Sequence, residues 1–63
     1  MKTVRYIYWQ GDGMWLGHLE EYPDYMTQGE TIEELQENLT DLYEELTSGR
    51  ISGVRRAAEL RIA

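Results

Sequence analysis

The chain has 63 residues, which is enough for one domain with a single small core. It contains no cysteine, which excludes disulfides and thiolate metal ligands and fits a cytoplasmic protein. The net charge of −6 argues against direct nucleic-acid binding. No apolar run is long enough to cross a membrane, and residues 1–4 do not form a signal peptide. So short a chain is marginally stable without disulfides or metals, so we expect a homo-oligomer, either a dimer or a larger assembly.

Three strands are predicted in the first half of the chain. Residues 2–9, KTVRYIYW, are rich in β-branched and aromatic side chains, and residues 14–19, MWLGHL, form the second strand. The glycine-rich turn at 10–13 joins the two in a β-hairpin. Pro23 ends the second strand because it lacks an amide donor, and residues 25–29 form a short third strand.

The longest predicted element is a helix that begins after Thr31 and ends at Gly49. The Thr31 hydroxyl and the Glu34 carboxylate predict a capping box, in which Glu34 reaches back to the Thr31 amide. Gly49 is placed to adopt the left-handed conformation that ends helices. Apolar residues at helical spacing form a seam that should pack on the sheet, namely Ile32, Leu35, Leu39, Leu42 and Leu46.

The outer face of this helix is acidic, with no Lys or Arg between Thr31 and Gly49. Its carboxylates are Glu33, Glu34, Glu37, Asp41, Glu44 and Glu45. Like charges one turn apart weaken an isolated helix, so packing of the seam must hold it in place. Such a face suits a basic partner. The alternative is a solvated surface that keeps a small protein soluble.

The C-terminal residues 54–63, VRRAAELRIA, combine helix-forming residues with an alternation of apolar and polar positions. We interpret them as a fourth strand, because such a strand would cover a sheet edge. The expected fold is therefore α+β with the order β-β-β-α-β. A three-stranded antiparallel sheet carries one helix on a face and is joined by the C-terminal fourth strand.

The sequence offers little for catalysis. His18 is the only imidazole and lies in the middle of a predicted strand, so neither a nucleophilic triad nor a metal site is predicted. Glu20, Glu21 and Asp24 cluster in one loop, but they lack the alternating oxygen-ligand spacing of a calcium site. We expect no catalytic residue, metal or cofactor, and no enzymatic activity.

Seven aromatic side chains are more than one small core can hide. For Tyr22 and Tyr25, which flank Pro23, a contact role and a core role are weighed equally. Rings among carboxylates have the composition of a protein-binding patch. The predicted partner surface consists of Glu20, Glu21, Tyr22, Asp24, Tyr25, Glu37, Asp41 and Glu44.

Several motifs run through most of the chain, namely YWQ at 8–10, MWLG at 14–17, LEEYPDY at 19–25, TQGET at 27–31 and EELQENL at 33–39. Together they resemble the HicB-like antitoxins of type II toxin–antitoxin systems. The resemblance implies a partial ribonuclease-H-like fold without nuclease activity. The first strand has Tyr6 and Ile7 at its middle, where the nucleases of that fold carry a metal-binding acid.

The resemblance also implies a function: neutralising a small, basic, RNA-cleaving toxin of the HicA type by masking its active site. Many HicB proteins append a DNA-binding domain, whereas residues 1–63 are expected to form one antitoxin domain without it. Two alternatives stay open. One is a self-assembling structural or regulatory domain with no toxin partner. The other is a degenerate metal-dependent nuclease or small hydrolase.

Overall fold

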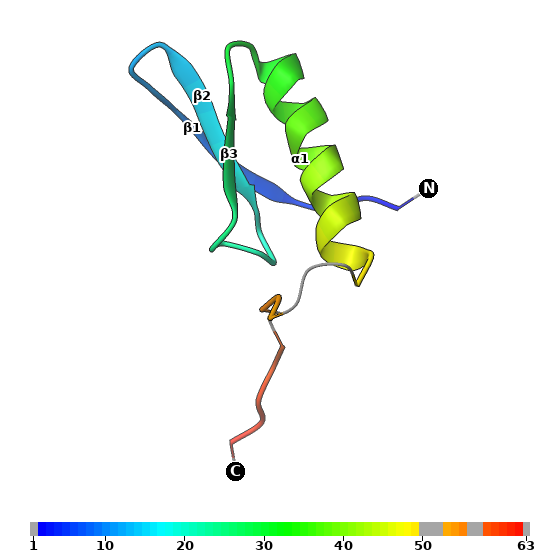
Figure 1. Ribbon diagram of the computed structural model, residues 1–63. Coiled ribbons are helices and arrows are strands. Elements are labelled where there is room, and N and C mark those ends of the chain that lie inside the picture. The colour runs from blue at the N-terminus through cyan, green and yellow to red at the C-terminus, as the bar shows by residue number, and fades with distance from the viewer. Residues whose placement is uncertain (1, 50–52, 56–57, 63) are drawn as a thin grey trace.

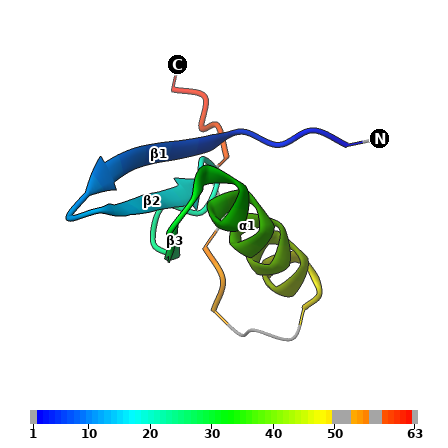
Figure 2. The same ribbon diagram turned by 90° about the horizontal axis from the view of Figure 1, so that it is seen from above.

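The computed structural model describes residues 2–49, 53–55 and 58–62. Strands β1 (Tyr6–Gly11), β2 (Met14–Leu19) and β3 (Met26–Gly29) precede helix α1 (Ile32–Thr47) (Figure 1). The strands form an antiparallel sheet in the order β1-β2-β3. The helix covers one face of this sheet, over β2 and β3 (Figure 2). The predicted α+β class, with three antiparallel strands and one helix, is confirmed.

A two-residue turn, Asp12-Gly13, joins β1 to β2, and Gly11 lies opposite Met14. Both turn residues have positive φ, 51° for Asp12 and 76° for Gly13. Turns of this kind match the right-handed twist of the flanking strands, and Asp and Gly are residues that tolerate them. The hairpin therefore follows directly from the local sequence.

The helix begins at the predicted cap, where the Glu34 amide donates to the Thr31 hydroxyl at 3.1 Å. The predicted partner of the Glu34 carboxylate is wrong by one residue, because it accepts from the Glu30 amide at 3.0 Å. Thr31 is extended (φ −127°, ψ 163°), and the amide within reach of that carboxylate is the one before the cap. Gly49 has φ 83°, as predicted for the end of the helix.

The core is small and lies between α1 and the sheet. Its buried side chains are Leu19, Tyr22, Leu35, Leu39 and Leu46. Three of these are seam residues of the helix, and the other two seam residues, Ile32 and Leu42, pack partly buried around them. The opposite face of the sheet is open, so a single layer of side chains holds helix and sheet together.

The fourth strand predicted over residues 54–63 is not confirmed. Residues 53–55 and 58–62 form no strand, while 56, 57 and 63 lie outside the described residues. Leu60 and Ile62 are 83% and 80% exposed. Alternating apolar residues form a stable strand when a neighbouring strand supplies hydrogen bonds, and the described residues of this segment pair with none. Among the described residues, no helix is long and apolar enough to cross a bilayer.

Candidate partner-binding site

The surface of α1 is divided into rows by the helical turn of about 100° per residue. Beside the buried seam runs a row without charge, consisting of Gln36, Thr40, Tyr43 and Thr47. Beside that row, further round the helix, runs an acidic row of Glu37, Asp41 and Glu44, which we call the acidic ridge. The neutral row thus separates the core from the ridge.

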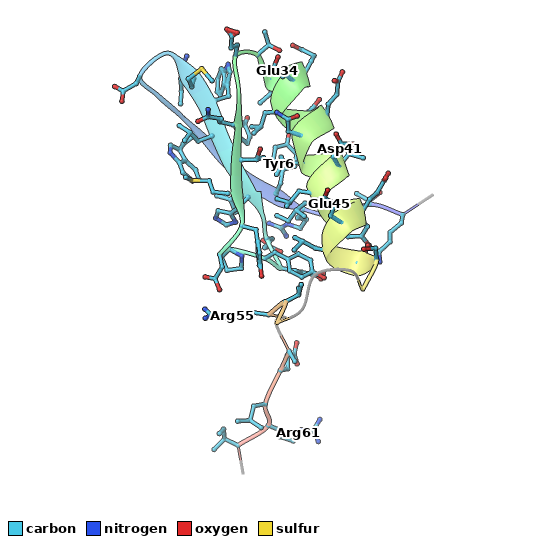
Figure 3. The ribbon with its side chains drawn as sticks, viewed as in Figure 1. Tyr6, Glu34, Asp41, Glu45, Arg55 and Arg61 are labelled. Atoms are coloured by element: carbon cyan, nitrogen blue, oxygen red, sulfur yellow. The ribbon has the colours of Figure 1, made fainter. Side chains whose placement is uncertain are left out.

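The neutral row faces the N-terminal end of β1. Gln36 Nε2 donates to the Tyr6 hydroxyl at 3.0 Å, and Tyr6 lies between sheet and helix (Figure 3). A shallow hollow of about 200 Å³ opens here, lined by Val4, Tyr6, Leu19, Gln36, Leu39, Thr40 and Tyr43. A second hollow of about 200 Å³ shares Val4, Leu19 and Tyr43 with the first and is also lined by Thr3, Arg5, Glu20, Glu21 and Tyr22. We call the two together the β1–α1 groove.

Lys2 lies at the rim of this groove, with its ammonium 5.4 Å from the centre of the Tyr43 ring. A side-chain hydrogen bond to Tyr43, and then charge interactions with Tyr43, raise the pKa of Lys2 above its usual 10.5. The charged form of Lys2 is thus the one that interacts favourably with Tyr43.

The predicted loop acids differ in what they face. Glu20 and Glu21 line the end of the groove, and Glu20 Oε2 lies 3.4 Å from Arg5 Nε. Asp24 lies outside the groove lining and binds Arg55 at 2.7 Å. Both ion pairs are exposed, so each adds little stability. They do, however, offset the charge that Glu20 and Asp24 would present to a partner.

Of the two roles weighed equally for Tyr22, the structure shows the core role, and its place in the predicted partner surface stays a prediction. Tyr22 is 5% exposed and belongs to the core, and Tyr25 packs partly buried against that core. The Tyr22 amide donates to the Leu19 carbonyl at 3.0 Å, and the Tyr25 amide to the Tyr22 carbonyl at 3.1 Å. These turns fold the loop inward, so Pro23 and Asp24 form its exposed tip.

The acidic ridge is exposed, and Asp41 projects from the side of α1 that faces away from the sheet (Figure 3). No residue of the ridge forms an ion pair within the described residues. The structure therefore brings Glu20, Glu21 and Tyr22 together in the lining of the groove, and the acidic ridge runs along one side of it. It leaves Asp24 and Tyr25 outside this site.

The groove itself was not predicted from the sequence. Its signal is the run of uncharged residues at Gln36, Thr40 and Tyr43 in a helix that is otherwise acidic on its surface. That spacing predicts that the three residues lie in one row along the helix. Only the way the helix packs on the sheet shows that this row faces Val4 and Tyr6.

The described residues contain no group of three or more His, Asp or Glu side chains arranged to hold a metal ion. The His18 ring makes a hydrogen bond at 2.9 Å with the Leu19 carbonyl and lies edge-on to Trp9 at 6.1 Å. These contacts place His18 on the open face of the sheet, away from the groove.

No protein-family model matches the chain, and no curated protein and no solved structure matches it either.

Proposed function

We propose that this protein is a non-enzymatic, HicB-like antitoxin module that binds a small, basic toxin of the HicA type and masks its RNA-cleaving site. The observation that carries the proposal is the acidic ridge beside an open apolar groove. From Tyr6 to Gly49 the chain has eleven carboxylates and no Lys or Arg. A cationic protein would be steered to this surface, and the groove would take an apolar or aromatic side chain of that partner.

The division of roles follows from exposure and charge. Glu37, Asp41 and Glu44 carry charge that no described residue offsets, so they attract the partner. Val4, Tyr6 and Tyr43 are partly buried and line the groove with apolar surface, so they stabilise the complex once it has formed. Because the ridge is solvent-exposed, affinity should fall as salt is added.

The fold assignment that accompanies this proposal is a partial ribonuclease-H-like domain at the level of the β-β-β-α order. The motifs named above and the observed order of elements support it. A fourth strand is not part of the proposal, because residues 53–55 and 58–62 form none. A module of this kind would act in the cytoplasm, where an RNA-cleaving toxin meets its substrate.

The test compares two triple variants with the same net charge. Glu37→Lys/Asp41→Lys/Glu44→Lys reverses the ridge, whereas Glu30→Lys/Glu45→Lys/Glu59→Lys reverses three exposed acids elsewhere. Each substitution changes the charge by two, so both variants have a net charge of 0 instead of −6. Circular dichroism establishes that both are folded.

The measurements are titration calorimetry against a HicA-type toxin and protection of RNA from cleavage by that toxin. We expect the native chain and the control variant to bind and protect, and the ridge variant to do neither. An equal loss of toxin binding in both variants would mean that net charge alone drives binding. Absence of a complex with the native chain at low salt would contradict the proposal.

A further inference from the structure

Three consecutive large side chains in the middle of β1 are exposed. Ile7 is 43% exposed, Tyr8 51% and Trp9 42%. Successive side chains of a strand point to opposite faces, so Ile7 and Trp9 lie on the open face and Tyr8 on the helix face. A partner on one face would leave the other exposed. A strand that pairs along the edge of β1 contacts the exposed side chains on both faces of the sheet.

The two edges of the sheet are not equivalent. On β3, the Gln28 carbonyl accepts from Asn38 Nδ2 at 2.7 Å, and α1 packs against that strand. On β1 the described residues provide no such cover. The Glu20 amide donates to the Arg5 carbonyl at 2.9 Å, so Arg5 faces β2. By alternation, the backbone groups of Tyr6, Tyr8 and Gln10 face outward.

β1 also lacks the features by which sheet edges avoid pairing. Residues Tyr6–Gly11 include no charge and no proline. Natural edge strands usually carry Lys, Pro or a bulge that blocks a further strand. An uncovered edge with outward amides and exposed rings on both faces is therefore a docking surface for another strand.

We infer that β1 pairs antiparallel with β1 of a second copy of this chain, across a two-fold axis at Tyr8, and that the two sheets join into one. In this register Tyr8 lies opposite Tyr8 of the other copy, and each Ile7 lies opposite the other copy's Trp9. Outward-facing residues meet outward-facing residues, so the ladder of hydrogen bonds continues across the axis.

The charges at the ends of β1 favour a second copy as the occupant. Arg5 precedes the strand and Asp12 follows it, and the Arg5 side chain is 81% exposed. Antiparallel pairing brings the Arg5 end of each copy beside the Asp12 end of the other. The helices contact β2 and β3 rather than β1, so they leave the β1 edge accessible to the second copy (Figure 2). Pairing also adds burial to a core of five buried side chains.

The chain's own C-terminal residues are the competing occupant. Arg55 is held by Asp24 at the β2–β3 loop, and Leu60 and Ile62 are more than three-quarters exposed. The described part of the tail, residues 53–55 and 58–62, therefore forms no strand on the β1 edge. A double variant, Leu60→Asp/Ile62→Asp, distinguishes the two occupants, because it should leave a β1–β1 dimer intact.

The first experiment measures mass by light scattering and amide exchange by NMR, from about 1 μM to about 1 mM protein. A β1–β1 dimer protects the Tyr6, Tyr8 and Gln10 amides only at high concentration, whereas Ile7 and Trp9 are protected at every concentration. A monomer throughout, or a dimer whose Tyr8 amide exchanges as in the monomer, would overturn the inference. So would loss of the dimer in the Leu60→Asp/Ile62→Asp variant.

The second experiment tests the register by charge pairing. Ile7→Lys alone and Trp9→Glu alone should each raise the dissociation constant by roughly several-fold, because each replaces both Ile7–Trp9 cross-strand pairs of the dimer by a charge beside an apolar side chain. An equimolar mixture should form a heterodimer, because Lys at position 7 then faces Glu at position 9. Met26→Lys, on the same open face but on β3, is the matched control and should leave the dimer intact.

Loss of the dimer in Met26→Lys, or no rescue in the mixture of folded variants, would contradict β1 pairing. The inference does not depend on the proposed toxin partner. Its variants leave the acidic ridge and the groove lining unchanged, so either proposal can fail while the other stands.

Discussion

Gly29, the last residue of β3, lies against the backbone of Leu35 in the first turn of α1. A Cβ atom built on Gly29 would lie 2.6 Å from the Leu35 nitrogen and 3.0 Å from its Cα. Leu35 is fully buried, so neither partner can move away easily. This approach sets how closely the start of the helix packs on β3.

Gly29→Ala should therefore destabilise the fold by about 1–3 kcal/mol, because the added methyl meets backbone rather than a flexible side chain. Urea unfolding measures the change. Gly11→Ala is the matched control, since its Cβ would meet only Leu16 Cδ1 at an ordinary 3.4 Å. Equal effects at both positions would show that loss of glycine, and not the close approach, causes the change.

Leu46→Ala should cost about 2–5 kcal/mol, because Leu46 is 1% exposed and a cavity would remain in its place. Because the described residues supply five buried side chains to the core, this is enough to unfold much of the population at 25 °C. Leu60→Ala, at a position 83% exposed, should leave the unfolding midpoint nearly unchanged. Comparable losses would mean that the tail contributes to the core.

Thr31→Ala should lower the free energy of unfolding by about 0.5–2 kcal/mol, because the Glu34 amide loses its acceptor at the start of α1. Thr31→Ser retains the hydroxyl and should recover most of the stability. Thermal unfolding followed by circular dichroism at 222 nm reports on the helix directly. A serine variant as unstable as the alanine variant would assign the effect to the lost methyl group.

Glu37→Gln should stabilise the isolated protein by roughly 0.4–1 kcal/mol, because Glu37 has a like charge one turn away on each side, Glu33 and Asp41. Added salt should raise the unfolding temperature of the native chain more than that of the variant. If Glu37 contributes to the proposed partner surface, the same change should weaken toxin binding. A stabilised variant with unaltered binding would remove Glu37 from that surface.

The contact between Lys2 and Tyr43 should make stability depend on pH in the alkaline range. The pKa of Lys2 is raised in the folded protein, so its contribution is fully present below 10.5 and is lost as the pH rises through the folded-state pKa. Unfolding temperatures of native protein and Lys2→Met should therefore differ at about pH 9 and converge above that window. A difference that stays constant with pH would contradict the contact.

Some features needed no tertiary information, because they depend on local conformation and spacing. The Asp12-Gly13 turn follows from the tolerance of both residues for positive φ. The start at Thr31 and the end near Gly49 follow from capping chemistry. Helical periodicity predicts the apolar seam, and the same spacing of residues predicts the acidic ridge. These predictions involve neighbours within a few residues along the chain.

Other features depended on how the helix lies on the sheet. The sequence left a core role and a contact role open for Tyr22, and in the structure two backbone hydrogen bonds, to Leu19 and from Tyr25, turn the loop so that the ring enters the core. Residues 54–63 alternate like a strand, but alternation does not provide the neighbouring strand that a ladder requires.

Sequence alone determined three strands, one capped helix, its apolar seam and its negative surface, since each is encoded by residues close together in the chain. The tertiary structure decided that Gln36 meets Tyr6, that Asn38 covers β3 and that β1 is left uncovered. The direction in which a helix crosses a sheet depends on contacts between residues far apart in sequence, such as Tyr6 with Gln36 and Gly17 with Leu35. The periodicity of the sequence does not predict those contacts.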